Sequence, residues 1–199
     1  FNRVSKINSR TILLWSRLLL RVPGSRLFIG GMPSVMPNFD HFVQEFEAAG
    51  VSRDRLEFFG RSSIEVYLDQ YKHVDVCLDA FPYNGATTSL HGLWMGVPTL
   101  SIKGNQLVSR NGYSLMGQVG LESMVADDDE GFIERGVYWA THLDELADIR
   151  KNMRARCLAS SKFNAEQIAH YLLQAMRTMW QRWCDELPPE AFEIHKKQE

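Results

Sequence analysis

The sequence is poor in residues that could form disulfides or metal centres. Its 199 residues include three cysteines, Cys77, Cys157 and Cys184, which lie far apart, with no Cys-x-x-Cys pair and no histidine at metal-ligand spacing. Such cysteines are typical of free thiols in a reducing compartment. We therefore expect a cytoplasmic protein with no metal and no other cofactor.

Long apolar runs and an excess of positive charge are also missing. The longest apolar candidate, Ile12 to Leu20, is broken by Ser16 and Arg17 and is shorter than the ~20 residues of a membrane span. The 22 basic and 24 acidic residues are scattered and give a net charge of −2. We expect neither a membrane partner nor a nucleic-acid partner.

Several common motifs are absent as well. The chain has no Gly-x-Gly-x-x-Gly, Walker or Gly-x-Ser-x-Gly segment, which disfavours dehydrogenases, P-loop enzymes and α/β-hydrolases. The run Asp127-Asp128-Asp129 precedes a predicted helix and is interpreted as a capping cluster rather than a metal site. Asp75 and Asp79 stand at opposite ends of a predicted strand and form no compact ligand pair.

What is present is a pattern of helical periodicity alternating with short apolar runs, typical of a parallel α/β sheet. The expected strands are residues 25–29, 56–59, 74–78, 98–102 and 123–126, with a loop over 30–37. The expected helices are 9–21 with Ser9 as its cap, 38–49, 63–72, 87–95, 129–140, 142–158 and 163–185, where Trp180 and Trp183 are interpreted as packing residues.

These elements predict one α/β domain, a Rossmann-like parallel sheet over residues 1–185 with a helical C-terminal annex. A polar tail over 186–199, opening with Leu187-Pro188-Pro189, is expected to be poorly ordered. The chain begins with Phe1 rather than Met, which indicates a piece of a longer protein. Phe1 and Asn2 are then expected to end a strand that begins upstream.

The segment after the third strand predicts an anion site. A loop over Asp79–Ala86 leads into a helix that opens with Thr87 and Thr88. In parallel sheets, ligands bind at the carboxyl ends of the strands, and a helix N-terminus favours a phosphate there. Gly85 would allow the backbone to approach closely. On this segment alone, an ordinary threonine N-cap is the favoured alternative.

Lys6 precedes the first helix in Phe1-Asn2-Arg3-Val4-Ser5-Lys6-Ile7. Taken alone, it is most simply a solvated lysine. If a strand ends at Asn2, however, Lys6 lies at the same sheet edge as the Asp79–Ala86 loop and supplies a cation for the same anion.

Several segments together resemble the C-terminal catalytic lobe of glycosyltransferase family 41, which includes O-linked N-acetylglucosamine transferases and Spindly-like proteins. The segments are Phe1 to Ile7, Asp75 to Asp79, Asn84 to Thr88 and Leu93 to Pro98, supported by Pro23-Gly24-Ser25, Arg55-Leu56, Ser109-Arg110 and Met179-Trp180. The resemblance covers about Phe1 to Trp183.

The resemblance implies the C-terminal lobe of a two-lobed GT-B fold that binds a nucleotide sugar. Lys6 would be catalytic, because it would contact the diphosphate and stabilise charge on the departing nucleotide. Thr87 and Thr88 would bind phosphate oxygens. Tyr67 would lie against the base, and His91 would lie near the ribose. The implied substrate-binding residues are Arg3, Tyr67, Asn84, Gly85, Ala86, Thr87, Thr88, His91 and Arg110.

The sequence departs from the animal-type pattern in this region. Ala86 stands where the family often has His, and His91 stands where the family commonly has an acidic residue. Tyr67 occupies the position at which the family has a base-contacting His, and Ile64 matches a nearby family lysine. Tyr67 can still stack on a base, and a neutral His91 can still accept a hydroxyl proton. UDP-N-acetylglucosamine is the default donor; UDP-glucose and GDP-fucose occur in the wider family.

Two functions remain open. The first is a metal-independent glycosyltransferase lobe whose full-length enzyme carries out protein O-glycosylation, with a protein acceptor, an N-terminal lobe and tetratricopeptide repeats upstream. Transfer requires the facing lobe, which this chain is too short to contain, so we expect the isolated chain to be inactive. The second is a non-catalytic nucleotide-sensing or protein-interaction module that kept the fold.

Overall fold

A computed structural model describes residues 2–35 and 39–194 and divides the chain into two compact units, Phe1–Cys157 and Leu158–Glu199. The domain predicted from the sequence, residues 1–185, spans the first unit and part of the second, and its limits stay a prediction. Residues 186–194 contain no helix or strand. None of the helices in the described residues is long and apolar enough to cross a membrane.

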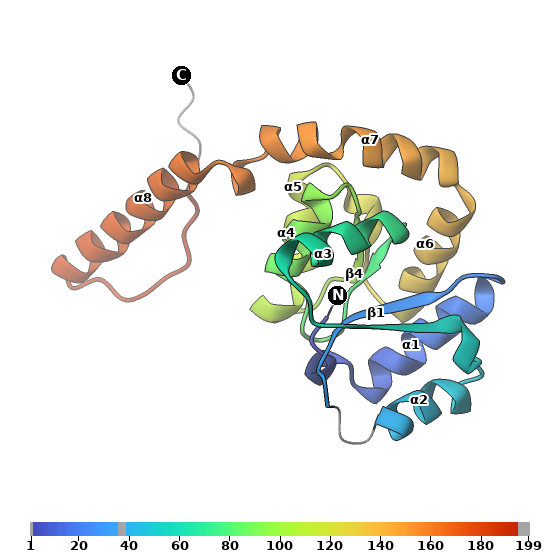
Figure 1. The fold of residues 1–199 in the computed structure, drawn as a ribbon. Helices are drawn as coiled ribbons and strands as arrows, with labels where there is room; N and C mark the ends of the chain where they lie inside the picture. The colour runs from blue at the N-terminus through green and yellow to red at the C-terminus, as the bar shows by residue number, and fades with distance from the viewer. Residues whose placement is uncertain (1, 36–38, 195–199) are drawn as a thin grey trace. The chain divides into compact units, whose positions relative to one another are not determined.

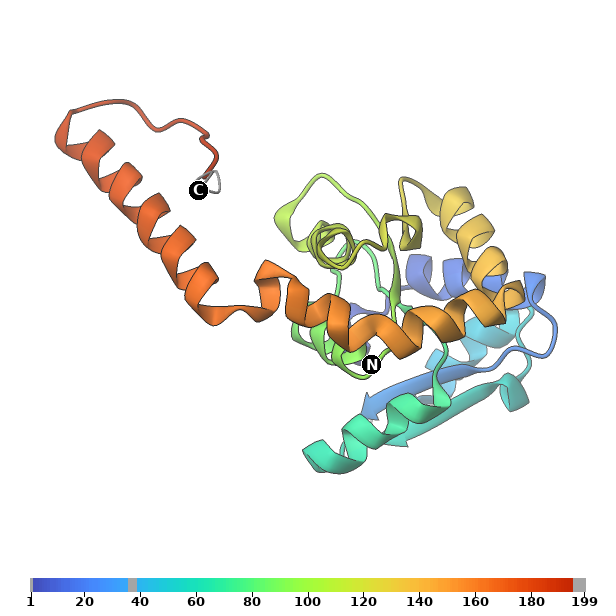
Figure 2. The ribbon, with the colours of Figure 1, turned by 90° about the horizontal axis from the view of Figure 1, so that it is seen from above.

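The strands of the first unit are all parallel to their neighbours, which confirms the predicted α/β class (Figure 1). In the described residues they form two sheets, β1-β2 and β3-β4-β5. The two strands of the first sheet run side by side in Figure 2. The strands are β1 (Leu27–Met32), β2 (Leu56–Gly60), β3 (Cys77–Leu78), β4 (Thr99–Ile102) and β5 (Val125–Ala126).

The α-helices of the chain follow the predicted order, with one addition. They are α1 (Ser9–Arg21), α2 (Phe39–Ala48), α3 (Ile64–Asp69), α4 (Thr87–Trp94), α5 (Asn111–Gln118), α6 (Asp129–Thr141), α7 (Leu143–Ala159) and α8 (Ala165–Cys184). The start predicted for α2, residue 38, lies outside the described residues. A 3-10 turn over Gln70–His73 completes the helix predicted over 63–72.

The N-cap residue of helix α1 lies one residue before the cap that the sequence predicted. The N-cap is Asn8, whose side chain accepts a hydrogen bond from the N–H of Thr11 at 2.9 Å, and Ser9 is the first helical residue. An Asn in extended backbone geometry satisfies a free N–H in the same way as Ser. The apolar face of α1 packs toward α6, where Gly136 has no room for a Cβ because Leu18 would lie within 2.6 Å.

Strand β1 is longer than predicted and β3 is shorter. β1 continues through Gly30 and Gly31 to Met32, with a register shift between Ile29 and Met32, so the prediction of a loop from residue 30 was wrong. Gly31 has a φ of +76°, which suits glycine at such an irregularity. β3 pairs with β4 only over Cys77–Leu78, because Pro98 opposite its start has no N–H to donate.

Helix α5 was missed by the sequence reading. Its residues Asn111, Gly112, Tyr113, Ser114 and Gly117 are weak helix formers, so no local signal announces it. Tertiary packing stabilises it instead, because Leu115 and Met116 are buried against β4 and β5. Propensity is a weak guide where buried contacts decide the conformation.

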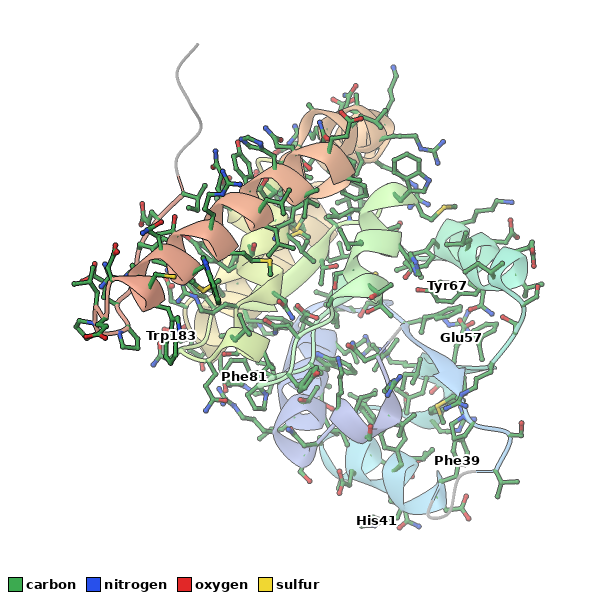
Figure 3. The ribbon with its side chains drawn as sticks, turned by 90° about the vertical axis from the view of Figure 1, so that its left-hand side faces the viewer. Phe39, His41, Glu57, Tyr67, Phe81 and Trp183 are labelled. Carbon is green, nitrogen blue, oxygen red and sulfur yellow. The ribbon has the colours of Figure 1, made fainter. Side chains whose placement is uncertain are left out.

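The second unit consists mainly of α8, which buries none of its residues. Trp180 and Trp183 are 67% and 76% exposed, and Trp183 stands on the helix surface in Figure 3. Their interpretation as packing residues stays a prediction.

Candidate functional site

The loop between β3 and α4 is held in shape by two buried polar side chains. Asp79, at the exit of β3, accepts a 2.7 Å hydrogen bond from the N–H of Gly85 through Oδ1. Asn84 is fully buried, and its amide donates to the carbonyl of Ala80 at 3.2 Å while its backbone N–H donates to Val108 at 2.9 Å. The Phe81–Pro82 peptide within this loop is cis. The hydrogen bonds tie the loop to the end of β3 and to Val108.

The N-terminus of α4 is not capped by a threonine. Its N-cap is Ala86, whose side chain can make no cap hydrogen bond, and Thr87 and Thr88 are the first two helical residues. The alternative of an ordinary threonine cap is therefore wrong. The first N–H groups of an uncapped helix carry partial positive charge and are suited to an anion.

Gly85 packs closely against this helix end. A Cβ at this position would collide with Ser89 Oγ, lie 2.9 Å from Thr88 Oγ1 and lie 3.3 Å from Asp79 Oδ1. The glycine therefore lets the backbone lie directly against the first turn of α4.

Lys6 reaches the same loop from the other end of the sequence. Its Nζ donates to the carbonyl of Asn84 at 3.0 Å and lies 4.0 Å from the ring centroid of Tyr83. The turn that carries it, Val4–Lys6, immediately precedes α1. The structure therefore brings Lys6 close to Asn84 and Gly85. The sequence predicted these three residues at one sheet edge.

The charges at this edge influence one another. Burial raises the pKa of Asp79 to about 6, partly offset by the hydrogen bond from Gly85 and by the Lys6 ammonium. Burial also lowers the pKa of Lys6, while Asp79 acts in the opposite direction. Oδ2 of Asp79 is buried, and the Ser101 hydroxyl beside it also lowers the pKa of Asp79. The site thus places the Lys6 ammonium near the buried Asp79 carboxyl group.

A chain of hydrogen bonds joins Tyr67 of α3 to Thr88 and His91 of α4. The hydroxyl of Tyr71 donates to the carbonyl of Thr88 at 3.1 Å, the hydroxyls of Tyr67 and Tyr71 are 2.8 Å apart, and Nδ1 of His91 is 3.2 Å from the Tyr67 hydroxyl. Tyr67 projects from α3 in Figure 3. The ring of Tyr67 meets those of Tyr71 and His91 edge to face.

Counting protons along this chain assigns the tautomer of His91. A carbonyl only accepts, so the single proton of Tyr71 is given to Thr88, and Tyr67 must donate its proton to Tyr71. The Tyr67 oxygen can then only accept from His91, which places a proton on Nδ1. In the neutral ring, Nε2 is left as a hydrogen-bond acceptor.

Other predicted site residues lie apart from these contacts. Arg3 is exposed, although its charge lowers the pKa of Lys6. Arg110 donates to the carbonyl of Gly104 at 3.4 Å and stacks over Tyr113. Asp128 caps α6 through Gly131, as predicted, and within residues 2–35 and 39–194 no cluster of three acidic, His or Cys side chains could hold a metal.

The sequence reading missed Asp79, Tyr71 and Tyr83 as parts of this site. The sequence pattern marks Asp79 only as the start of the loop and as the end of a family-like segment, although an acid directly before a glycine-containing loop is itself a signal of a loop anchor. Tyr71 lies one helical turn after Tyr67, a spacing that places both on one face. Tyr83 carried no signal, because its contact with Lys6 joins distant segments.

Parallel strands, an open helix N-terminus and a lysine at one sheet edge are typical of α/β lobes that bind nucleotides or phosphates. Residues 1–172 match the family model described as Glycosyl transferase family 41, and the chain belongs to that family.

Known relatives cover almost all of this chain. A probable UDP-N-acetylglucosamine–peptide N-acetylglucosaminyltransferase, SPINDLY of Hordeum vulgare, is 30% identical over 93% of this chain and 20% of its own length. A UDP-N-acetylglucosamine–peptide N-acetylglucosaminyltransferase of Caenorhabditis elegans is 27% identical over 94% of this chain and 16% of its own. This chain therefore spans about a fifth of the length of such relatives.

A solved structure shares the fold. The Thermobaculum terrenum O-GlcNAc transferase mutant K341M superposes with a TM-score of 0.82 at 32% identity, over 94% of this chain and 36% of that one. The match confirms the predicted GT-B lobe architecture.

Proposed function

We propose that this chain is the nucleotide-sugar-binding C-terminal lobe of a metal-independent glycosyltransferase. The full-length enzyme would transfer N-acetylglucosamine from UDP-N-acetylglucosamine to a protein side chain, with a facing N-terminal lobe supplying the acceptor site. The observation that carries the proposal is the contact of Lys6 with the loop that leads into the uncapped N-terminus of α4.

These groups suit the chemistry of the departing nucleotide. As the acceptor oxygen bonds to the anomeric carbon, the bond from that carbon to the diphosphate oxygen breaks and its electron pair stays on the diphosphate. Lys6 and the helix dipole would stabilise this charge, as fixed donors do at developing anions elsewhere. The acceptor proton would leave to a base outside this chain.

The contacts of α3 and α4 support the placement of the nucleoside. Thr87 and Thr88 offer hydroxyls and N–H groups to phosphate oxygens at the helix start. Tyr67 offers a ring for the base, and Nε2 of His91 would accept a hydrogen bond from a ribose hydroxyl, a function that an acidic residue could otherwise serve. Cytoplasmic location and upstream tetratricopeptide repeats belong to the same proposal.

Calorimetric titration of the chain with UDP, GDP and uridine tests this function. We expect UDP to bind more tightly than uridine, and its affinity to be the same with EDTA and with Mg²⁺ or Mn²⁺. A chain that bound neither nucleotide would be an interaction module instead. A tenfold gain in affinity with a divalent ion, about 1.4 kcal/mol, would contradict the metal-independent site.

A further inference from the structure

The positive charge of Lys6 is held by groups that do not neutralise it. None of the ion pairs within residues 2–35 and 39–194 includes Lys6. Its Nζ instead donates to the carbonyl of Asn84 at 3.0 Å and lies 4.0 Å from the centroid of the Tyr83 ring. A carbonyl and an aromatic ring attract a cation through partial charges, so the full charge of the ammonium stays available to an anion.

Asp79 is the acid whose charge acts on Lys6. Burial lowers the pKa of Lys6, and the charge of Asp79 raises it in part. Asp79 is 3% exposed and accepts its hydrogen bond from Gly85 inside the loop. An ammonium that turned toward this carboxyl group would form a buried ion pair and lose much of its attraction for a diphosphate. Tyr83 is 49% exposed, so its ring holds the ammonium toward solvent, where a ligand arrives.

The contact with Lys6 is the main contribution of the Tyr83 side chain. Its hydroxyl makes no hydrogen bond and its ring meets no other aromatic ring within the parts of the chain that the structure describes. A ring that is half exposed adds little to the core.

The backbone that carries the ring is tied down by the next residue. Asn84 is fully buried, its amide donates to the carbonyl of Ala80 at 3.2 Å, and its Oδ1 accepts from the N–H of Gly112 at 3.4 Å. Two adjacent residues, Tyr83 and Asn84, therefore provide both contacts of the lysine.

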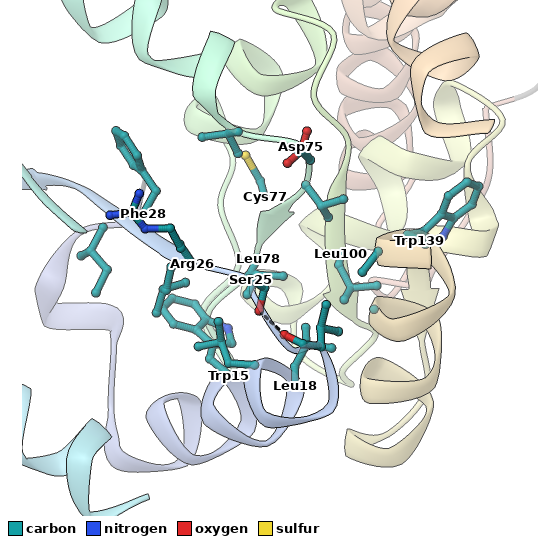
Figure 4. A pocket seen from close by; sticks show the side chains of 18 of the residues that line it. Trp15, Leu18, Ser25, Arg26, Phe28, Asp75, Cys77, Leu78, Leu100 and Trp139 are labelled. Carbon is teal, nitrogen blue, oxygen red and sulfur yellow. Dashed lines mark hydrogen bonds between the residues drawn. The ribbon is translucent and has the colours of Figure 1, made fainter. Parts of the chain in front are cut away.

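The segment that carries the lysine is bonded to the same loop. The side chain of Asn2 donates to the carbonyl of Leu78 at 2.9 Å, and the indole N–H of Trp15 donates to the carbonyl of Asp79 at 3.3 Å. Trp15 and Leu78 line one cavity of about 380 Å³ in Figure 4. These two bonds lie on either side of the lysine in the sequence, so they set the distance that its side chain spans to reach the ring.

We propose that Tyr83 is a positioning residue, whose ring face holds the Lys6 ammonium beside the loop that leads into α4 without neutralising it. The inference rests on the proposed function, in which Lys6 binds the diphosphate. A lysine side chain is flexible and has many conformers. A ring that favours one of them lowers the entropy that diphosphate binding would otherwise cost. The ring performs this function, and the hydroxyl is not needed for it.

A double-mutant cycle, measured by calorimetric titration with UDP, tests the proposal. Tyr83→Leu should weaken UDP binding about threefold to tenfold, as for the loss of a partly exposed cation–π contact, and Tyr83→Phe should restore the affinity. In the Lys6→Ala background, Tyr83→Leu should have no further effect, because it acts through Lys6. Tyr138→Leu changes a tyrosine of similar exposure, 42%, on α6 and should bind UDP like the unmodified chain.

Proton NMR without nucleotide separates this inference from the proposed function. The ring current of Tyr83 should shift the Cε protons of Lys6 upfield in the unmodified chain and in Tyr83→Phe, and this shift should disappear in Tyr83→Leu. A chain that shows the shift but binds no UDP would contradict the proposed function, while the hold of Tyr83 on Lys6 would stand.

Three results would overturn the proposal. The first is the absence of the upfield shift in the unmodified chain. The second is an unchanged UDP affinity in Tyr83→Leu. The third is an equal loss of affinity from Tyr83→Leu in the unmodified and Lys6→Ala backgrounds, because Tyr83 would then contact the ligand or shape the loop independently of Lys6. Urea unfolding of each variant checks that it is folded.

Discussion

Nζ of Lys6 donates a 3.0 Å hydrogen bond to the backbone carbonyl of Asn84, which follows it by 78 residues. The bond ties the turn before α1 to the loop before α4, so the cation and the open helix end are positioned together. An ammonium has three donors, and one bond to a carbonyl leaves others for a diphosphate.

We expect Lys6→Ala to weaken UDP binding about 10- to 100-fold, because a charge-assisted contact contributes about 1.5–3 kcal/mol. Thr87→Ala and Thr88→Ala each remove a neutral hydroxyl, about 0.5–1.5 kcal/mol, and leave the helix N–H groups in place. Titration of all three variants with UDP and with uridine measures the difference. An equal loss for uridine in Lys6→Ala would show that Lys6 supports the fold of the loop and not the diphosphate.

Gly85→Ala should distort the turn before α4, because the new Cβ would lie 2.9 Å from Thr88 Oγ1 and collide with Ser89 Oγ. Overpacking of this kind costs about 1–3 kcal/mol of folding free energy. The matched control is Gly60→Ala, whose Cβ would meet no atom within 4 Å. Urea unfolding and UDP titration of both variants check the expectation; equal behaviour of the two would mean that the turn relaxes freely.

Because of Asp79, the free energy of unfolding should fall as the pH rises through about 6. The pKa of Asp79 is raised from 3.8 to about 6 by burial, so the folded state holds the proton more tightly than the unfolded state. The stabilisation is complete below pH 3.8 and is lost as the pH passes 6, a difference of about 3 kcal/mol.

Asp79→Asn cannot ionise and should flatten this dependence between pH 4 and 7, while its amide oxygen still accepts from Gly85. Urea unfolding at several pH values measures it, with Asp75→Asn, which removes an exposed carboxyl group, as the control. Parallel pH profiles of Asp79→Asn and the unmodified chain would rule out this role of Asp79.

Tyr67→Phe should remove the contact that keeps the proton of the His91 ring on Nδ1. The Tyr67 oxygen accepts from Nδ1 of His91, so its removal leaves both ring nitrogens free to carry the proton. Nitrogen NMR of the histidine ring should show Nδ1–H in the unmodified chain and a shift toward Nε2–H in the variant. Tyr138→Phe changes a tyrosine that contacts a different histidine, His142, and should leave the His91 signals unchanged. An Nε2–H signal for His91 in the unmodified chain would contradict the proton order.

The sequence by itself determined the elements whose signals are local. Apolar periodicity located α1, α2, α6 and α8, and Gly50 marked the end of α2. The glycine and threonines after the third strand predicted an anion site beside α4. These features depend on residues near one another in the chain, so the pattern predicts them directly.

Only the tertiary structure decided the features that depend on distant residues. The weak helix formers of α5 adopt a helix because Leu115 and Met116 find a buried surface. Asp79 has a raised pKa because the fold removes it from water, and His91 has a defined tautomer because Tyr71 meets the carbonyl of Thr88. The division into two sheets likewise depends on which strands lie beside one another, and strand pairing is a long-range choice that no short segment of sequence encodes.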